Sequence, residues 1–288
     1  MLDYNAPGAL RLVADQIADG IETHTARPAK YSWRIKPSKL NGECVAEIWY
    51  GFRWVSRSPT NGQGARRMDR GTDRENSLVR YLRQAGWTVE DTDPSKAGRK
   101  FNQWNFTALD GHVSAYLDGI MRHPEFFDGN KVLLELKTMA KGRFGRLLSK
   151  RSLMVTEPEY YGQVQIYMDG YNLDFCVFFA ECQDTQEIYV EVIRRDRDLA
   201  SRLLMVAETI KNSRVRPSRV AQSPTYHKCK TCEFLNVCHY DANVDKNCRS
   251  CVNAIAAEGG RFYCDKWKAF IPDEKAIMAA CPHHDPVK

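Results

Sequence analysis

The sequence predicts a mixed α/β fold, and three observations lead to this prediction. From residue 73 onward, helical and strand-like segments follow one another in the order helix, three strands, helix, strand. Residues 131–138 alternate in character as a half-buried strand does, whereas residues 173–182 form the continuous apolar run of a buried strand. The 288 residues suffice for one large domain and a small additional module.

The N-terminal part is expected to contain two helices and a loop. Residues 7–22 repeat apolar side chains with a helical period after a proline, which predicts a helix that packs or docks against another surface. A second helix is expected just after Cys44. Residues 56–70 are rich in Gly, Ser, Asn and Arg and predict a mobile basic loop. That loop offers three side chains either to phosphates or to solvent: Arg66, Arg67 and Arg70.

The central part predicts a helix followed by strands. Residues 73–85 carry apolar side chains at helical spacing and are followed by a glycine, so we expect a helix that ends there. Glu75 then lies in the first turn, where the helix dipole favours a carboxylate. Strands are expected near 87–90, 101–107, 112–120 and 131–138.

A basic segment, KGRFGRLLSKR at residues 141–151, follows the last of these strands. Its two glycines predict a flexible loop, which contacts phosphates or simply lies in solvent. The side chains in question are Arg143, Arg146, Lys150 and Arg151.

The next part predicts a helix, two strands and another helix. Residues 156–168 predict a helix stopped by Gly170, and Gln163 and Tyr167 share one of its faces because they are four residues apart. Cys176 and Cys182 are expected in the hydrophobic core. The further elements are strands over 173–182 and 187–193 and a basic helix over 196–212.

Two carboxylates and a lysine are predicted to converge. Asp118 ends one apolar run, and Glu135 and Lys137 share one face of the following strand because successive side chains alternate. Carboxylate oxygens suit a hard cation such as magnesium, and a neighbouring lysine can position water or stabilise negative charge. This set indicates metal-assisted phosphodiester hydrolysis. The plainer interpretation is a half-solvated strand with a turn at Asp118.

Composition places the chain among intracellular proteins that can bind a polyanion. The formal charge is +6, from 42 Lys and Arg against 36 Asp and Glu. No apolar run is long enough to cross a bilayer, and no secretory signal precedes the first helix. Ten cysteines in such a chain are expected to bind metal rather than to form disulfides.

These motifs, in this order, resemble those of the PD-(D/E)XK nuclease superfamily, in particular the RecB-like exonucleases of CRISPR-associated and phage-encoded systems. The family's metal-binding aspartate corresponds to Asp118, and its D/E-x-K pair corresponds to Glu135 and Lys137. Its Q-x3-Y helix motif corresponds to Gln163 and Tyr167. Together these matches lie within a resemblance that covers residues 30–240.

The family's first helix motif, G-x3-H or G-x3-E, corresponds to Gly71 and Glu75. This chain therefore has Glu where many RecB-like members have His. The resemblance implies a restriction-endonuclease-like core, with a mixed sheet flanked by helices. It also implies Mg²⁺ or Mn²⁺ as cofactor and DNA as substrate.

The iron-sulfur members of that family have one cysteine before the nuclease core and three after it. PSKLNGEC resembles their upstream motif with one extra residue, and CKTCEFLNVC supplies three more cysteines. Four thiolates can hold a 4Fe-4S cluster, which we favour. The alternative is zinc, with His227 or His239 in place of Cys44. The four candidate ligands are Cys44, Cys229, Cys232 and Cys238.

The C-terminal segment predicts a separate zinc-binding module. Two of its four cysteines form a C-x2-C pair, and the spacing suits a structural zinc site. Few large apolar residues follow residue 243, so the segment is expected to need a bound zinc ion in order to fold. His283 or His284 could replace the last cysteine. The candidate ligands are Cys248, Cys251, Cys264 and Cys281.

The expected organisation is an N-terminal helix over 1–29, a RecB-like nuclease domain over 30–243 and the zinc-binding module over 244–288. The expected function is a metal-dependent DNA exonuclease of recombination, end resection or phage DNA processing. An endonuclease of the same fold is one alternative, and an inactive DNA-binding or scaffold protein is another. DNA is the expected partner, with a recombination or single-strand-binding protein as a further candidate, in the cytoplasm of a bacterium or a phage-infected cell.

Overall fold

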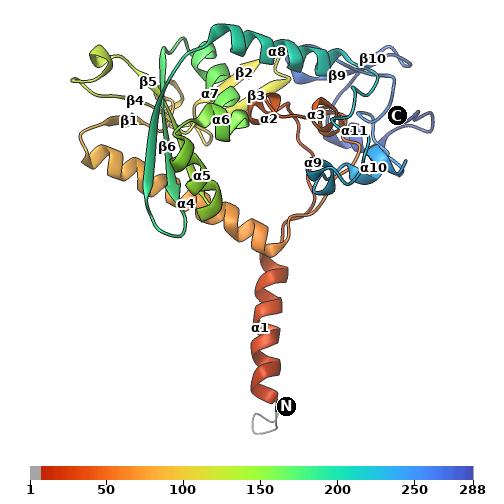
Figure 1. Ribbon diagram of the computed structural model, residues 1–288. Helices are drawn as coiled ribbons and strands as arrows, with labels where there is room; N and C mark the ends of the chain where they lie inside the picture. Colours follow the sequence, from red (N-terminus) through yellow and green to blue (C-terminus); the bar gives the residue numbers. More distant parts are fainter. Residues whose placement is uncertain (1–7, 288) are drawn as a thin grey trace.

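The computed structural model of the protein describes residues 8–287 and confirms the mixed α/β fold (Figure 1). The predicted helix over 7–22 is present from Ala9, and residues 1–7 and 288 lie outside the described part. The elements are α1 Ala9–Thr25, α2 Pro37–Leu40, α3 Val45–Phe52, α4 Gly62–Gln84, β1 Thr88–Glu90, η1 Pro94–Lys96, β2 Asn105–Ala108, β3 Val113–Tyr116, β4 Gly119–Arg122, η2 Phe127–Gly129, β5 Val132–Met139, α5 Lys141–Lys150, α6 Leu153–Thr156, α7 Pro158–Gly170, β6 Phe175–Cys182, β7 Ile188–Arg194, α8 Arg197–Asn212, α9 His227–Lys230, α10 Leu235–His239, β8 Ala254–Ala256, η3 Glu258–Gly260, β9 Phe262–Cys264, β10 Ala269–Ile271 and α11 Glu274–Ala279.

A five-stranded sheet in the order β1-β4-β5-β6-β7 forms the centre of the fold. β5 and β6 are parallel and the other neighbouring strands are antiparallel, so the sheet is mixed. The parallel pair requires a crossover connection, and α5, α6 and α7 provide it.

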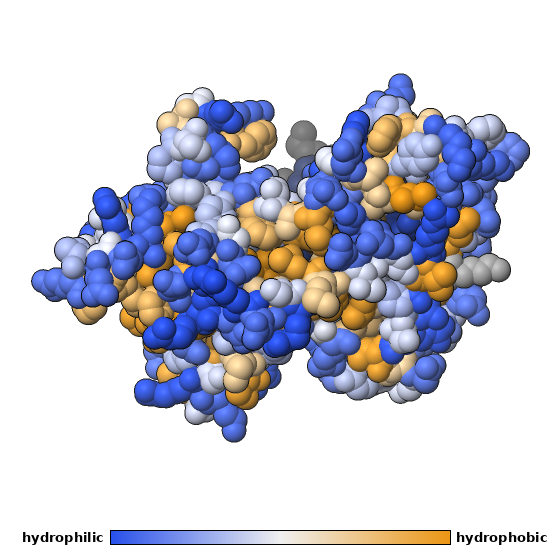
Figure 2. Space-filling model, turned by 90° about the horizontal axis from the view of Figure 1, so that it is seen from above, coloured by the Kyte–Doolittle hydropathy of each residue, from blue (hydrophilic) through white to orange (hydrophobic). Residues whose placement is uncertain are grey.

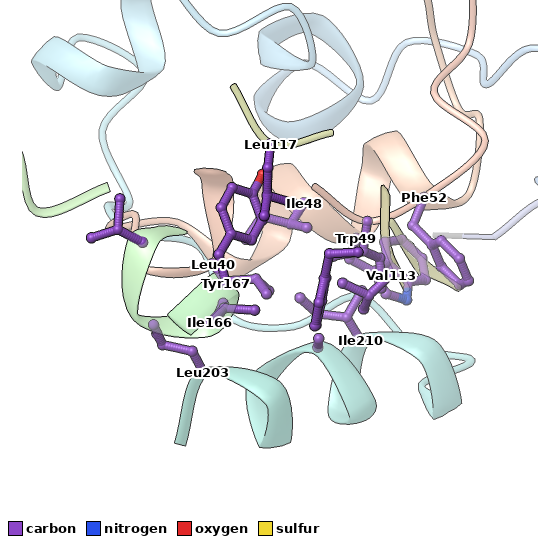
Figure 3. Packing of buried hydrophobic residues seen from close by; sticks show 14 of the residues in the cluster. Leu40, Ile48, Trp49, Phe52, Val113, Leu117, Ile166, Tyr167, Leu203 and Ile210 are labelled. Carbon is purple, nitrogen blue, oxygen red and sulfur yellow. The ribbon is translucent and has the colours of Figure 1, made fainter. Parts of the chain in front are cut away.

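Helices cover both faces of this sheet. On one face, Leu134 and Leu136 of β5 pack in a cluster with Leu78 and Val79 of α4. On the other face, Leu133 belongs to the main core together with residues of α2, α3, α7 and α8 (Figure 3). The alternation predicted for residues 131–138 therefore positions one strand between two hydrophobic clusters.

Three expectations about local structure were wrong. Residues 62–70 belong to α4 rather than to a loop, because Asn61 caps the helix by accepting a hydrogen bond from the Gly64 N–H at 2.8 Å. Residues 141–150 form α5 rather than a flexible loop, because Phe144 and Leu147, three residues apart, are both buried. The strand expected over 112–120 is divided into β3 and β4, which belong to different sheets.

Helix α1 projects from the body at the N-terminal end of α4 (Figure 1). The C-terminal end of α1 contacts the N-terminal end of α4. There, Arg66 of α4 donates to Glu22 of α1 at 2.8 Å and to Thr25 Oγ1 of α1 at 2.6 Å. Its apolar side chains Leu10, Ile17 and Ile21 are exposed. No helix among residues 8–287 is both long and apolar enough to span a membrane.

The C-terminal segment forms a small three-stranded sheet, β10-β9-β8, followed by α11. It lies beside α9 and α10, on the opposite side of the molecule from the five-stranded sheet (Figure 1). Seen from above, the molecule narrows between these two halves, and apolar residues are visible at the junction (Figure 2).

Two buried arginines attach this segment to the N-terminal part of the chain. Arg53 Nη1 donates to the Ala254 carbonyl at 2.8 Å, and Arg249 Nη1 donates to the Trp33 carbonyl at 3.2 Å. The Arg249 guanidinium also lies 4.4 Å from the ring centroid of Trp54. Because their guanidinium groups bind backbone carbonyls and aromatic faces, both charges are tolerated inside the protein.

A buried histidine at this junction predicts a pH-dependent stability. His112 Nε2 donates to the Ala257 carbonyl at 2.7 Å. Burial, together with the nearby charges of Lys211, Arg249 and Arg34, lowers the pKa of His112 to about 4, although the hydrogen bond to the Ala257 carbonyl opposes the shift. Between about pH 6.5 and pH 4 the unfolded chain therefore binds a proton that the folded chain does not, so stability falls as the pH falls through this range.

Acidification from about pH 7 to about pH 4.5 should lower the free energy of unfolding of the wild-type protein. We expect this decrease to be about 2–3 kcal/mol larger than in a His112→Gln variant. The glutamine amide can still donate to the Ala257 carbonyl but does not titrate. Urea unfolding of both proteins at a series of pH values measures the difference. Two curves that stay parallel would contradict the assignment.

Candidate active site

Strand β5 places Glu135 and Lys137 on the same face, and their side chains meet. Lys137 Nζ lies 2.5 Å from Glu135 Oε1, and only 1% of the glutamate is exposed. The neighbouring residues Leu134 and Leu136 point into the opposite hydrophobic cluster. The strand therefore holds one ion pair between two layers of apolar side chains.

Asp118 joins this pair from the connection between β3 and β4. Its Oδ2 accepts a hydrogen bond from the Leu136 N–H at 2.7 Å and lies 3.6 Å from Lys137 Nζ. The chain changes sheets at this point, and the Leu117 N–H donates to the Trp104 carbonyl at 3.1 Å. The structure thus brings together the two carboxylates and the lysine that the sequence singles out.

Glu75 lies beside them on α4. It was expected in the first turn of a helix, but α4 begins at Gly62, so Glu75 is near the middle of the helix and faces the site. Burial, together with the nearby Asp118 carboxylate, raises the pKa of Glu75 to about 6, and Lys137 opposes the shift. A helix-capping role is therefore excluded, and Glu75 is a third carboxylate of the same cluster.

Gln163 and Tyr167 of α7 face the same cluster from the other side. Gln163 Nε2 donates to Glu135 Oε1 at 2.8 Å, which fixes the orientation of the carboxylate. Tyr167 is only 2% exposed and packs against Phe106, with 6.0 Å between ring centroids. Burial and the nearby Glu135 raise the pKa of the Tyr167 phenol. Tyr167 is thus a core aromatic beneath the site rather than a surface side chain.

Residues that sequence reasoning missed support Lys137. Its Nζ lies 5.3 Å from the ring centroid of Tyr160, and Arg143 Cζ lies 4.7 Å from the same centroid. Arg143 also pairs with the buried Glu157, with 2.7 Å between Nε and Oε1. Arg143 was expected in a loop, but it is held in the site. Tyr160 is three residues before Gln163, so the helical period could have indicated it.

The other predicted basic residues are exposed on two helices. Arg146, Lys150 and Arg151 are exposed at the end of α5. Arg67 and Arg70 are exposed on the N-terminal half of α4.

Burial and charge compete within the pair of Glu135 and Lys137. Burial raises the pKa of Glu135, whereas Lys137 lowers it and Asp118 and Glu75 raise it. Burial alone would lower the pKa of Lys137, but the carboxylates of Glu135 and Asp118 outweigh burial and raise it. The lysine is therefore firmly charged, and the site holds more carboxylates than it has ammonium groups to neutralise them.

The first set of four cysteines surrounds a single pocket. Cys44, Cys229, Cys232 and Cys238 line it together with Arg219 and His239. Burial raises the pKa of Cys232 to about 11. His227 is exposed and lies outside this lining, so of the two alternative histidine ligands only His239 is in place.

Two buried polar atoms in this lining lack a partner. Neither Arg219 Nε nor His239 Nε2 makes a hydrogen bond with the protein. Such orphaned groups are costly, and a negatively charged thiolate group or cluster would satisfy a donor at this place. The pocket therefore fits a thiolate-bound metal centre.

The second set of four cysteines lines another pocket, in the C-terminal segment. Cys248, Cys251, Cys264 and Cys281 surround it with His284. Cys251 Sγ accepts a hydrogen bond from the Asp285 N–H at 3.5 Å, as a thiolate ligand does. His284 Nε2 lies 3.0 Å from Ser250 Oγ, and His283 packs near Trp267.

In residues 8–287, no three His, Cys, Asp or Glu side chains stand close enough to form a ready set of metal ligands. The carboxylate cluster has the donor chemistry for a hard cation, and each cysteine pocket has four soft donors.

Comparisons with known proteins found distant likenesses of fold. A scan of protein-family models found no match, and a search of curated proteins found none either. The solved structure of LHK-Exo, an alkaline exonuclease from Laribacter hongkongensis, is 17% identical with a TM-score of 0.44, over 67% of this chain and 90% of that one. LHK-Exo in complex with dAMP is 17% identical with a TM-score of 0.45, over 62% and 86%. SSO0001 is 15% identical with a TM-score of 0.44, over 81% and 98%.

The geometry predicts strong energetic coupling between Glu135 and Lys137. Lys137→Met should lower the free energy of unfolding by about 3–5 kcal/mol, because it leaves a buried carboxylate without its partner. The double variant Lys137→Met/Glu135→Gln should recover much of this loss. Lys131→Met is the matched control, since Lys131 pairs with Glu90 at the surface and should cost less than about 1 kcal/mol. Additive effects in denaturant unfolding would disprove the coupling.

Proposed function

We propose that the protein is a divalent-metal-dependent deoxyribonuclease that hydrolyses phosphodiester bonds as an exonuclease. One observation carries this proposal, namely the convergence of Asp118, Glu135 and Glu75 around the ammonium group of Lys137. Three carboxylates around a single lysine in a partly buried site lower the stability of the folded protein. Such clusters are typical of functional sites.

The donor set suits Mg²⁺ or Mn²⁺. Asp118 and Glu135 would hold the cation, and Glu75 is the further carboxylate available to it. A bound cation neutralises charge on the reacting phosphate and lowers the pKa of an attached water.

Lys137, Gln163 and Glu75 would each contribute differently to hydrolysis at this site. Lys137 Nζ, held by Glu135 and by the face of Tyr160, presents N–H donors that orient a water or stabilise negative charge on phosphate. Gln163 keeps Glu135 Oε1 in a fixed direction through its 2.8 Å hydrogen bond. Glu75, whose pKa is raised to about 6 by burial, can accept a proton from water near neutral pH.

We expect Asp118→Asn and Glu135→Gln each to lower the rate of DNA hydrolysis by at least about 100-fold, because the charge that stabilises the reacting phosphate is lost. The assay uses end-labelled linear, closed circular and single-stranded DNA with Mg²⁺ or Mn²⁺. An exonuclease degrades the linear forms and leaves the circle intact, whereas cutting of the circle would make the protein an endonuclease.

Glu208→Gln is the matched control, because Glu208 is exposed on α8, away from the cluster. It should keep wild-type activity. Wild-type rates in the Glu135→Gln protein would overturn the assignment. Circular dichroism of each variant separates loss of chemistry from loss of fold.

The cysteine pockets extend the proposal to two structural metal centres. Cys44, Cys229, Cys232 and Cys238 would hold a 4Fe-4S cluster, with Arg219 Nε available as a donor to it. Because Cys44 precedes α3 and the other three cysteines lie on α9, on α10 and between them, such a centre would join distant parts of the chain. The second set, Cys248, Cys251, Cys264 and Cys281, would hold one Zn²⁺.

Protein purified without oxygen should be brown and contain about four iron and four sulfide, with about one zinc. Cys44→Ser should remove the iron and leave the zinc, and Cys264→Ser should do the reverse. Cys176→Ala is the control, because Cys176 is buried in β6 away from both pockets. Elemental analysis that finds two zincs and no iron would instead favour zinc with His239 at the first pocket.

A further inference from the structure

A long polar groove lies between the N-terminal segment and the β2–β3 hairpin. One wall is formed by residues 31–38, and the other wall comes from β2 and β3. The groove encloses about 820 Å³, which makes it larger than the two cysteine pockets. It belongs to none of the metal sites proposed above.

Backbone pairing makes the groove floor a small, ordered surface. Ile35 forms a single parallel bridge with Val113, so the chain at Ile35 pairs with the edge of the two-stranded β2–β3 sheet. The Ile35 N–H donates to the His112 carbonyl at 2.8 Å, and the Ser114 N–H donates to the Ile35 carbonyl at 3.3 Å.

Polar side chains share the exposed face of this small sheet. Asn105 is directly opposite Tyr116, and Thr107 is directly opposite Ser114, so all four lie on one face. The buried residues Phe106 and Val113 point to the other face. The groove therefore presents hydroxyl and amide groups between exposed aromatic and basic side chains.

The groove is basic and aromatic. Arg34 and the exposed Lys36 line it, and none of its lining residues in the described chain is an aspartate or a glutamate. Arg34 Nη1 donates to the Gly260 carbonyl at 2.9 Å, so Lys36 is the cation that the groove offers to a phosphate. Tyr116 is 57% exposed and Trp33 is 36% exposed, and Trp33 is held edge-on against Trp54 at 4.8 Å between centroids. Exposed rings of this size, next to cations and hydroxyl groups, are typical of platforms on which unpaired bases stack.

Both walls of the groove are continuous along the chain with elements of the candidate active site. Tyr116 is two residues before Asp118, a separation of about 7 Å along an extended chain. The other wall continues into α2, and Asn41 Nδ2 just beyond it donates to the Pro158 carbonyl at the start of α7. The walls of the groove are therefore joined through the chain to the elements that carry Asp118 and Gln163.

We propose that this groove binds a single-stranded segment of the DNA substrate and passes it to or from the carboxylate cluster. Lys36 contacts phosphates, and Tyr116 and Trp33 stack on bases. The bases of an intact duplex are stacked on one another and are not free to stack on these rings, so the groove selects unpaired DNA. This inference rests on the proposed nuclease function, because it names the form of substrate that the same site receives.

The test measures binding of a fluorescein-labelled oligothymidine of about ten nucleotides to full-length Glu135→Gln protein, by fluorescence anisotropy. Adding Tyr116→Ala should weaken this binding about tenfold or more, whereas Tyr116→Phe should retain it, since a stacked ring suffices. Lys36→Glu should also weaken it and make it less dependent on salt. Phe126→Ala, at another exposed aromatic residue, is the matched control.

Cross-linking with 5-iodouracil in the oligonucleotide provides a second readout, and Tyr116 or Trp33 should be the modified residue. Unchanged affinity in Tyr116→Ala and Lys36→Glu, with cross-links elsewhere, would overturn the inference even if the wild-type protein hydrolyses DNA. Loss of affinity in both variants would support the groove even if the wild-type protein showed no hydrolysis. The two proposals can therefore fail separately.

Discussion

The buried ion pair between Glu135 and Lys137 is the interaction on which the site depends. A charge inside a protein is tolerated when its partner and its hydrogen bonds are in place, and here Gln163 and Tyr160 provide the remaining contacts. Asp118 accepts a hydrogen bond from the Leu136 N–H, so the backbone of the same strand sets the position of this carboxylate. One strand thus fixes two charged side chains directly and a third through its amide.

Contacts between distant parts of the chain hold the surroundings of this strand. Residues 31–55 form one wall of the groove, contribute α2 and α3, and receive Arg249 from the C-terminal segment. Arg53 binds the same segment through the Ala254 carbonyl. Both guanidinium groups are buried, and their charges are tolerated because backbone carbonyls across this contact accept their hydrogen bonds. Separating these parts would break several of these hydrogen bonds at once. We infer that the C-terminal segment stabilises the elements that line the active site.

Local patterns in the sequence predicted most single elements, and the family resemblance indicated side chains that meet from different elements, but some caps and tertiary contacts were missed. Alternation along β5 is enough to place Glu135 and Lys137 together, and the cysteine spacing separates the two pockets. The start of α4 was missed because its glycines and arginines resemble a loop, although the Asn61 cap forms a helix there. The pairing of Arg143 with Glu157 and the burial of Arg249 depend on tertiary contacts that no local pattern reports.

The central claim is that water attacks a phosphodiester bond beside Lys137. Digestion of DNA in water enriched in oxygen-18, followed by mass spectrometry of the products, tests it most directly. We predict that each released phosphate group carries one labelled oxygen, and that Glu135→Gln protein yields no labelled product above background. Unlabelled products, or equal labelling by the Glu135→Gln protein, would contradict the account.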